Sequence, residues 1–200
     1  RQQVRQVVHL EALGGCDQLV GLHLPDQVSA NFLVQLHQHV AFDLGREQAP
    51  AAVLHTDGPT ALLVEADGGS RGNPGVAAGG AVVMDPATGS VISEIGVFVG
   101  VATNNVAEYQ GMIAGLEAAF ELAPGASVHV RMDSKLVVEQ MTGRWKIKHP
   151  DMQVLARRAQ SLIAGRHVSF EWIPRAENAL ADAAANESMD RREGFRRDLA

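Results

Sequence analysis

Four acidic side chains occupy positions from which they could bind metal ions together. Asp67 and Asp133 each stand where an apolar stretch typical of a strand ends, and Glu108 and Asp182 lie early in two stretches typical of helices. Because the carboxyl ends of adjacent parallel strands meet at one crevice, these acids are expected to converge. Converging carboxylates repel one another unless cations neutralise them, and all-oxygen ligand sets select Mg²⁺ or Mn²⁺. Two such ions, about 3.5–4 Å apart, promote in-line hydrolysis of a phosphodiester, which is the chemistry that the pattern indicates.

Each acid taken alone also has a purely structural explanation. Asn105 and Glu108 have the spacing of a capping box, and Asp133 is placed to cap the helix that follows it. Asp67 could belong to a glycine-rich turn, and Asp182 could face solvent. Only the joint arrangement of the four acids favours metal binding.

The elements that would position these acids follow from hydrophobic periodicity and turn residues. The expected order is strands at 61–67, 76–84 and 91–99, a helix at 104–122, a strand at 127–132, helices at 134–141 and 151–163, a strand at 167–173 and a closing helix at about 177–190. Short turns make the first three strands antiparallel, and the later crossovers add two parallel strands. The prediction is an α/β fold with a five-stranded mixed sheet flanked by helices.

Composition limits the partners of this domain. The formal net charge of −6 provides no global basic surface, so a nucleic-acid partner would need a local cluster of Lys and Arg. Cys16 is the single cysteine, which excludes an intrachain disulfide. No apolar run is long enough to span a bilayer, and the first residues lack the apolar core of a secretory signal. We therefore expect a soluble cytoplasmic protein without a membrane partner.

Residues 1–60 differ from the remainder of the chain. They contain most of the histidines and only weak periodicity, and they end in a Pro- and Ala-rich stretch, which places a domain boundary near Thr60. His37 and His39 lack a carboxylate or cysteine at ligand spacing, and we assign them no metal site. The prediction is an N-terminal extension without an assigned role, with disorder as one alternative, followed by a functional domain at 61–200.

Several ordered motifs resemble those of type 1 ribonucleases H. The strings DGGSRGNPG, TNNVAEYQG, MDSKLVVEQMTGRWKIKHPD and AENALAD follow one another as in that family, over about residues 62–190. Because only a short turn joins the two middle helices, the chain is most similar to the archaeal and actinobacterial branch that lacks a basic handle helix.

This resemblance implies a fold, an activity and a cofactor. The fold is ribonuclease H-like, and residues 61–200 form the ribonuclease H domain. The activity is that of an endoribonuclease that cuts the RNA strand of RNA–DNA hybrids and leaves 5′-phosphate and 3′-hydroxyl ends. The cofactor is a pair of Mg²⁺ ions, replaceable by Mn²⁺, on a catalytic quartet that consists of Asp67, Glu108, Asp133 and Asp182.

Candidate substrate contacts surround this quartet. RNA is distinguished from DNA by its 2′-hydroxyl, which exposed main-chain groups and amide side chains can contact. In the family the glycine-rich loop and an Asn pair make these contacts, and a Thr before the pair touches a DNA phosphate. The corresponding residues are Gly68, Gly69, Ser70, Arg71, Gly72, Asn73, Thr103, Asn104 and Asn105. A glycine-rich string alone more often only joins strands, and Thr103 is equally suited to cap the helix.

A dense basic stretch lies between the two middle helices. Arg144, Lys146 and Lys148 are candidates for phosphate binding, and Trp145 offers a flat apolar surface to a sugar or base. The alternatives are a solvated turn and a core position for Trp145. Beside the predicted active site, nucleic-acid binding is the favoured interpretation.

One departure from the family concerns proton transfer. Many members carry a His in the loop before the last acid, whereas this chain has Arg175 there, with Asn178 as a further substrate-binding candidate. Arg stays charged, so Arg175 can hold phosphate but cannot act as an ordinary proton shuttle. The alternatives are a hybrid-binding module with little activity and another nuclease of the same superfamily. The complete quartet and the ribose-reading loop favour the hybrid-cutting enzyme, which we expect to be a monomer.

Overall fold

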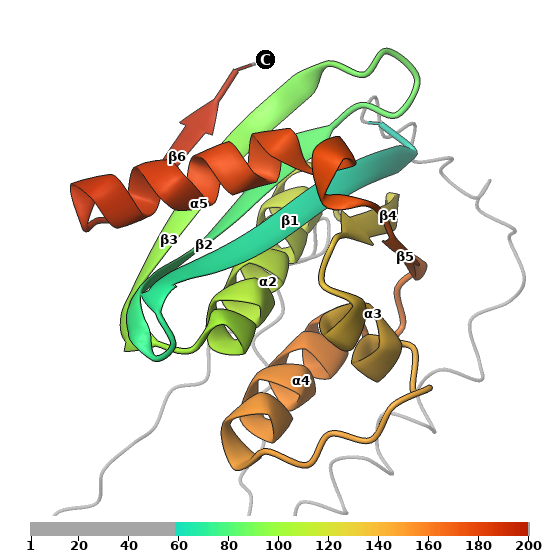
Figure 1. Ribbon diagram of the computed structural model, residues 1–200. Helices are drawn as coiled ribbons and strands as arrows, with labels where there is room; N and C mark the ends of the chain where they lie inside the picture. Colours follow the sequence, from blue (N-terminus) through green and yellow to red (C-terminus); the bar gives the residue numbers. More distant parts are fainter. Residues whose placement is uncertain (1–58, 200) are drawn as a thin grey trace, which may run out of the picture. The chain divides into compact units, whose positions relative to one another are not determined.

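The computed structural model describes residues 59–199 of the chain. Nearly all of the expected extension at 1–60, including His37 and His39, lies outside the described residues. Within 59–199, no helix is long and apolar enough to cross a membrane. The described elements, shown in Figure 1, are β1 (Ala61–Gly72), β2 (Gly75–Met84), β3 (Val91–Ala102), α2 (Asn104–Leu122), β4 (Ser127–Met132), α3 (Lys135–Met141), α4 (Pro150–Ile163), β5 (Val168–Trp172), the 3₁₀ turn η1 (Arg175–Glu177), α5 (Ala179–Arg191) and β6 (Phe195–Asp198).

The strands form one mixed sheet in the order β5-β4-β1-β2-β3-β6. β1, β2 and β3 are successive antiparallel neighbours, whereas β1, β4 and β5 run parallel. The α/β class and the change from antiparallel to parallel pairing are therefore confirmed. The predicted strand number is wrong, because the described sheet has six strands and not five: β6 pairs antiparallel with the outer edge of β3.

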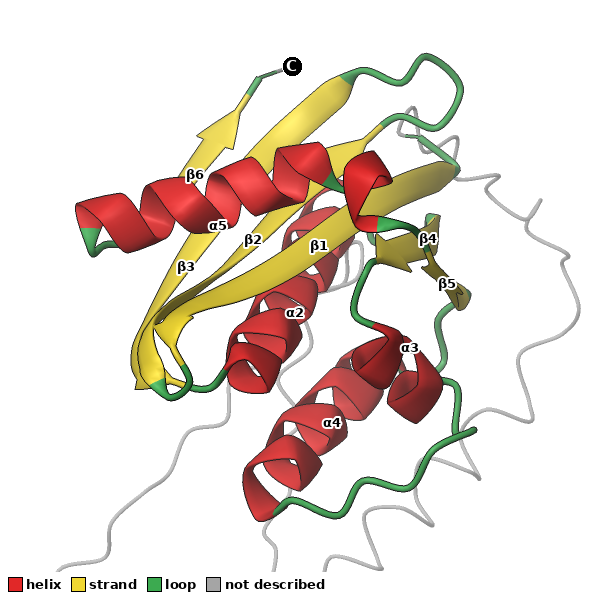
Figure 2. Ribbon diagram, in the orientation of Figure 1, coloured by secondary structure: helices red, strands yellow, loops and turns green. Residues whose placement is uncertain are grey.

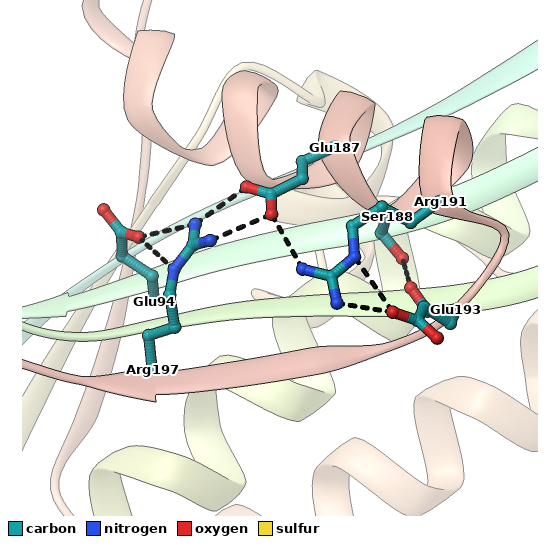
Figure 3. Close-up of polar contacts among 6 residues, drawn as sticks. All are labelled: Glu94, Glu187, Ser188, Arg191, Glu193 and Arg197. Carbon is teal, nitrogen blue, oxygen red and sulfur yellow. Dashed lines mark hydrogen bonds and ion pairs between the residues drawn. The ribbon is translucent and has the colours of Figure 1, made fainter.

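β6 escaped prediction because its sequence, FRRD, has neither an apolar run nor an alternating pattern. Contacts with distant residues hold it instead. The Phe195 ring lies against Gly96, where an added Cβ would come within 2.4 Å of the ring. Arg197 pairs with Glu187 of α5 at 2.8 Å and with Glu94 of β3 at 2.9 Å (Figure 3). The strand is thus held by one aromatic contact and a network of ion pairs.

Helices cover both faces of the sheet. α2 crosses one face and α5 the other, as Figure 2 shows, and α4 packs against α2. The core lies between α2 and the strands β1, β2 and β4, because their alternating apolar side chains point toward that helix. Its largest fully buried side chains include Tyr109, Leu62, Met112, Ile113, Leu116 and Met132.

Glycines allow α2 to lie directly on the sheet. A Cβ on Gly68 would come within 2.1 Å of the backbone N of Glu108, and one on Gly111 would come within 2.3 Å of the Asp67 carbonyl oxygen. Gly79 is as tightly placed, since its Cβ would lie 2.4 Å from the backbone N of Gly111. Any larger residue at these crossings would push the helix away. The same contacts set how deeply Glu108 reaches into the sheet.

The glycine-rich stretch predicted as a loop is mostly strand. β1 and β2 stay paired as far as Gly72 and Gly75, so only Asn73 and Pro74 form the turn. The closing helix also differs from the prediction, because η1 and Asn178 precede α5. By contrast, α2, α3, α4 and β4 match their expected bounds to within one residue.

Candidate active site

Asp67 lies at a fork in the sheet. The parallel pairing of β1 with β4 ends at Ala66 and Met132, whereas the antiparallel pairing of β1 with β2 continues past Asp67. β4 ends at the fork, and Asp133 follows directly. The Gly68 N–H donates a hydrogen bond to Asp67 Oδ1 at 2.8 Å. The two acids expected at strand ends therefore lie at the same fork, although Asp67 is inside β1 rather than at its end.

Glu108 enters the fork from the first turns of α2. The helix begins after Thr103, whose hydroxyl accepts a hydrogen bond from the Val106 N–H at 3.4 Å. Thr103, and not Asn105, therefore caps the helix. The Asn104 side-chain amide donates to Glu108 Oε1 at 3.3 Å, as residues four apart on one helix face can do. This bond orients the Glu108 carboxylate toward the crevice.

Three of the four predicted acids form a close cluster. Asp67, Glu108 and Asp133 each contribute one carboxylate oxygen to a group whose atoms lie within 4.8 Å of one another. Asp182, in the first turn of α5, lines the same crevice, which has a volume of about 240 Å³. Arg175 donates to Asp182 Oδ1 at 2.7 Å. The structure thus brings all four acids to one crevice. The guanidinium of Arg175 is paired with the fourth acid, Asp182.

Burial and the repulsion of neighbouring charges raise the pKa of two of these acids, Glu108 and Asp67. Glu108 is only 6% exposed, and burial followed by the charges of Asp67 and Asp133 raises its pKa to about 9. Burial and then the Asp133 charge raise the pKa of Asp67 to about 7. Among the described residues, Glu108 Oε2 is buried and has no hydrogen-bond partner. A divalent cation would satisfy this oxygen and remove the repulsion, so the all-oxygen donor set fits Mg²⁺ or Mn²⁺.

Asn178 connects the start of α5 to the fork. Its side-chain amide donates to Asp133 Oδ1 at 2.7 Å and to the Ala66 carbonyl at 2.9 Å. The residue is fully buried, with 0% of its surface exposed. Its side chain therefore supports Asp133 from within the protein and does not face the crevice surface.

Two further supporting residues were not found from the sequence. The Trp172 indole N–H donates to the Asp133 carbonyl at 3.0 Å, and the Asn186 amide donates to Asp182 Oδ2 at 2.9 Å. Asn186 could have been found, because it follows Asp182 by one helical turn. The Trp172 contact joins two strand ends that are far apart in the sequence, and no local signal marks it.

The glycine-rich hairpin contributes one wall of the crevice. Gly68, Gly69, Ser70 and Arg71 line it together with Asn104. Beyond these residues, the hairpin tip contacts the start of α2, and a smaller hollow opens there. Its lining comprises Asn73, Thr103, Asn105, His149 and Met152. The hairpin and the Asn pair are thus adjacent, while Gly72 lies at the tip and lines neither hollow.

The basic stretch follows α3 and does not line the crevice. Arg144 is paired with Glu139 at 3.1 Å, which offsets part of the positive charge. Trp145 is 47% exposed, so the alternative of a core position is wrong. Lys146 and Lys148 lie in the irregular segment before α4. All four side chains are exposed.

The sheet, its covering helices and the acids at the fork define a ribonuclease H-like α/β domain. The reverse transcriptase-like family matches residues 65–188, more than half of the chain. Ribonuclease HI of Halobacterium salinarum is 42% identical over 140 residues, which cover 70% of this chain and 69% of that protein. The chain therefore belongs to the type 1 ribonuclease H family.

A longer relative and two solved structures are also similar to this chain in sequence or fold. The bifunctional protein Rv2228c of Mycobacterium tuberculosis is 54% identical over 130 residues, which cover 64% of this chain and 35% of that protein. The chain thus spans about a third of the length of the mycobacterial relatives it matches. The solved N-terminal RNase H domain of that protein has a TM-score of 0.63 and 52% identity, over 66% of this chain and 95% of the solved one. LC11-RNase H1, solved in complex with an RNA/DNA hybrid, has a TM-score of 0.62 and 37% identity, over 66% of this chain and 98% of that one.

Proposed function

We propose that this chain is an endoribonuclease that hydrolyses the RNA strand of RNA–DNA hybrids with the help of divalent metal ions. The observation that carries the proposal is the acid cluster at the fork, where three carboxylate oxygens lie within 4.8 Å of one another. Family membership supports the class of reaction. The hybrid in the LC11-RNase H1 structure supports the substrate.

The acids would hold the metal ions, and their neighbours would fix the acids. The ligands of two Mg²⁺ ions, replaceable by Mn²⁺, would be Asp67, Glu108, Asp133 and Asp182. When bound, such ions supply the positive charge that favours attack of water on a phosphodiester and departure of the 3′ oxygen. Asn178 keeps Asp133 in place and Asn104 keeps Glu108 in place, so the ligands need little rearrangement. Hydrolysis in this direction leaves a 5′-phosphate and a 3′-hydroxyl.

The hairpin and the start of α2 would recognise the RNA ribose. A 2′-hydroxyl both donates and accepts hydrogen bonds, which suits exposed backbone groups and amide side chains. The proposed contacts are Gly68, Gly69, Ser70, Arg71, Gly72, Asn73, Asn104 and Asn105. Thr103 caps α2 and also lines the small hollow, so its hydroxyl serves the helix and borders the path proposed for a DNA phosphate.

Positive side chains would hold the phosphates on either side of the cut. Arg144, Lys146 and Lys148 would neutralise backbone charge, and Trp145 would stack on a sugar or base. Arg175 lies in the crevice and would hold the phosphate nearest the acids. Because a guanidinium does not release its proton, proton transfer at this site would fall to water rather than to a side chain of this loop.

The remaining proposals concern the whole protein. We place the functional domain at 61–200 and treat 1–60 as an extension without an assigned role. We further propose that the protein acts in the cytoplasm as a monomer.

The test is a cleavage assay on the full chain. With Mg²⁺ or Mn²⁺ it should cut the RNA strand of a hybrid and leave duplex DNA and duplex RNA intact. Asp67→Asn and Asp133→Asn should each abolish cleavage, whereas Glu117→Gln, at an exposed acid of α2 paired with Arg158, should not. Equal cleavage in EDTA would reject metal dependence, and equal cleavage of duplex DNA would indicate another nuclease of the superfamily. Tight hybrid binding without cleavage would indicate a binding module.

A further inference from the structure

A triad of charged side chains lies beside the crevice without lining it. Arg131 of β4 is the register partner of Glu65 of β1, and both point to the same face of the sheet as the acids two residues further on. Arg131 Nη1 lies 3.5 Å from Glu65 Oε1, and Arg131 Nη2 lies 3.3 Å from Glu177 Oε2. One guanidinium therefore joins a strand carboxylate to a carboxylate of η1.

Burial differs sharply along this triad. The side chain of Glu65 is 6% exposed, that of Arg131 is 25% exposed and that of Glu177 is 56% exposed. Arg131 Nε is also buried, without a hydrogen-bond partner among the described residues. Burying such charges costs desolvation energy, and an apolar pair at the same place would serve stability as well or better. The triad is better explained by the position of its exposed member, Glu177, in the turn η1.

That exposed end is the 3₁₀ turn that carries two residues of the active site. η1 begins with Arg175, ends with Glu177 and is followed directly by Asn178. Within the turn, the Glu177 N–H donates to the Pro174 carbonyl at 2.8 Å and the Asn178 N–H donates to the Arg175 carbonyl at 3.0 Å. These bonds close the turn on itself and do not fix it to the sheet. Asn178, which directly follows η1, donates to the Ala66 carbonyl of β1 at 2.9 Å, and the Arg131–Glu177 pair provides a second tie to the sheet at the turn itself.

We propose that Arg131, which is paired with the buried Glu65, is a positioning residue. Through its pair with Glu177 it holds η1 on the sheet. It thereby keeps the Arg175 side chain paired with Asp182 and the Asn178 amide bonded to Asp133. Only the catalytic consequence rests on the proposed function. The positioning itself concerns the geometry of η1 and the binding of metal by Asp133, which Asn178 orients.

Two kinds of variant separate positioning from stability. Glu177→Ala removes the exposed end of the triad and leaves the Glu65–Arg131 pair intact, so the fold should keep its thermal stability. Glu177→Gln retains an oxygen that can accept from Arg131 and should recover part of the effect. The double variant Glu65→Leu with Arg131→Met replaces the buried charges by apolar side chains and should fold while losing the tie to η1. Arg158→Met, which removes an exposed pair with Glu117 at 2.7 Å, is the matched control.

Three measurements on the full chain test the proposal. In hydrogen–deuterium exchange, the Glu177 and Asn178 amides should exchange faster in Glu177→Ala and in the double variant, while amides of β1 and α2 stay unchanged. In calorimetry with Mn²⁺ alone, affinity should fall by up to about fivefold, the range expected from the loss of one half-exposed ion pair. In hybrid cleavage, kcat should fall because Asp133 loses its orientation, and KM should rise because Arg175, the proposed phosphate contact, moves with η1. The control should change none of these.

The outcomes are distinct from those that test the proposed function. Unchanged exchange and unchanged Mn²⁺ affinity in Glu177→Ala would overturn the positioning role, whether or not the protein cleaves hybrids. If the double variant fails to fold, amide exchange and Mn²⁺ affinity of Glu177→Ala still test the positioning role. If the unaltered protein shows no hybrid cleavage, the proposed function fails, whereas exchange and Mn²⁺ binding continue to test the role of Arg131.

Discussion

The side-chain amide of Asn178 donates a hydrogen bond to Asp133 Oδ1 at 2.7 Å and thereby joins the start of α5 to the end of β4. The same nitrogen donates to the Ala66 carbonyl at 2.9 Å, on the strand that carries Asp67. One buried amide therefore holds two strands and a helix around the fork. The Asp133 carboxylate is therefore oriented by a buried side chain of the protein itself.

Replacing Asn178 by Ala should impair both stability and catalysis. Asp133 and Ala66 would each lose a buried donor, which typically lowers the free energy of unfolding by about 1–3 kcal/mol. Because Asp133 would also lose its orientation, hybrid cleavage should fall about 10- to 100-fold. Gln140→Ala is the matched control, since its buried amide accepts from the Tyr109 hydroxyl at 2.9 Å, away from the crevice. Loss of stability without loss of cleavage in Asn178→Ala would contradict the argument.

The metal-free protein should lose stability as the pH rises. Burial and neighbouring carboxylates raise the pKa of Asp67 to about 7 and that of Glu108 to about 9, well above their ordinary values of 3.8 and 4.5. At a pH between the ordinary and the raised pKa of each acid, the folded state binds more protons than the unfolded state. The free energy of unfolding therefore decreases with increasing pH in that range. The decrease should be at least about 1.4 kcal/mol, the linkage free energy of one pKa unit. Thermal unfolding in EDTA from about pH 5 to about pH 9 measures it.

Glu108→Gln and added metal provide the controls for this pH dependence. The variant lacks one raised pKa, so in EDTA it should lose less stability with pH than the unaltered protein. Saturating Mn²⁺ favours the ionised acids and should reverse the trend in the unaltered protein. Stability in EDTA that increases from about pH 5 to about pH 9 would show that these carboxyls are not held protonated.

The fold was predictable wherever burial follows a local pattern. In β4 the residues Val128, Val130 and Met132 alternate with more exposed ones, and the strand was placed correctly. The proximity of Asp67 and Asp133 could be predicted because the ends of adjacent parallel strands converge. Composition and order along the chain are sufficient for statements of this kind.

The remainder depended on contacts between distant residues. β6 is held by the contact of Phe195 with Gly96 and by the ion pairs of Arg197, and nothing in FRRD predicts a strand. β1 extends through its glycines because β2 offers equally small partners. The pairing of Arg175 with Asp182 spans only seven residues, yet it requires η1 to turn the guanidinium back over the helix start. Such features require the three-dimensional packing and not the sequence pattern alone.

Gly68→Ala should disrupt the crevice more than its small size suggests. Its Cβ would lie 2.1 Å from the backbone N of Glu108, so α2 must shift and carry the Glu108 carboxylate away from Asp67. Overpacking of this kind costs typically about 1–3 kcal/mol, and Mn²⁺ affinity should fall with it. Gly125→Ala is the matched control: nothing lies within 4 Å of its Cβ, so stability and Mn²⁺ affinity should not decrease. Equal behaviour of the two variants in unfolding and Mn²⁺ calorimetry would refute the close approach of α2.

Arg175→Ala should have opposite effects on metal and on substrate. The guanidinium lies 2.7 Å from Asp182, so its removal leaves the acids more attractive to cations, whereas a phosphate loses its partner. The Arg175 side chain is 76% exposed. The gain in Mn²⁺ affinity should therefore be at most about fivefold at low salt, since exposed pairs contribute roughly 0.2–1 kcal/mol. Hybrid binding in EDTA, measured by fluorescence anisotropy, should weaken.

Arg71→Ala is the control for this prediction. Its partner Asp190 lies outside the acid cluster, so the variant should leave Mn²⁺ affinity unchanged. If Arg175→Ala bound Mn²⁺ less tightly, Arg175 would be orienting Asp182 for the metal rather than competing with it.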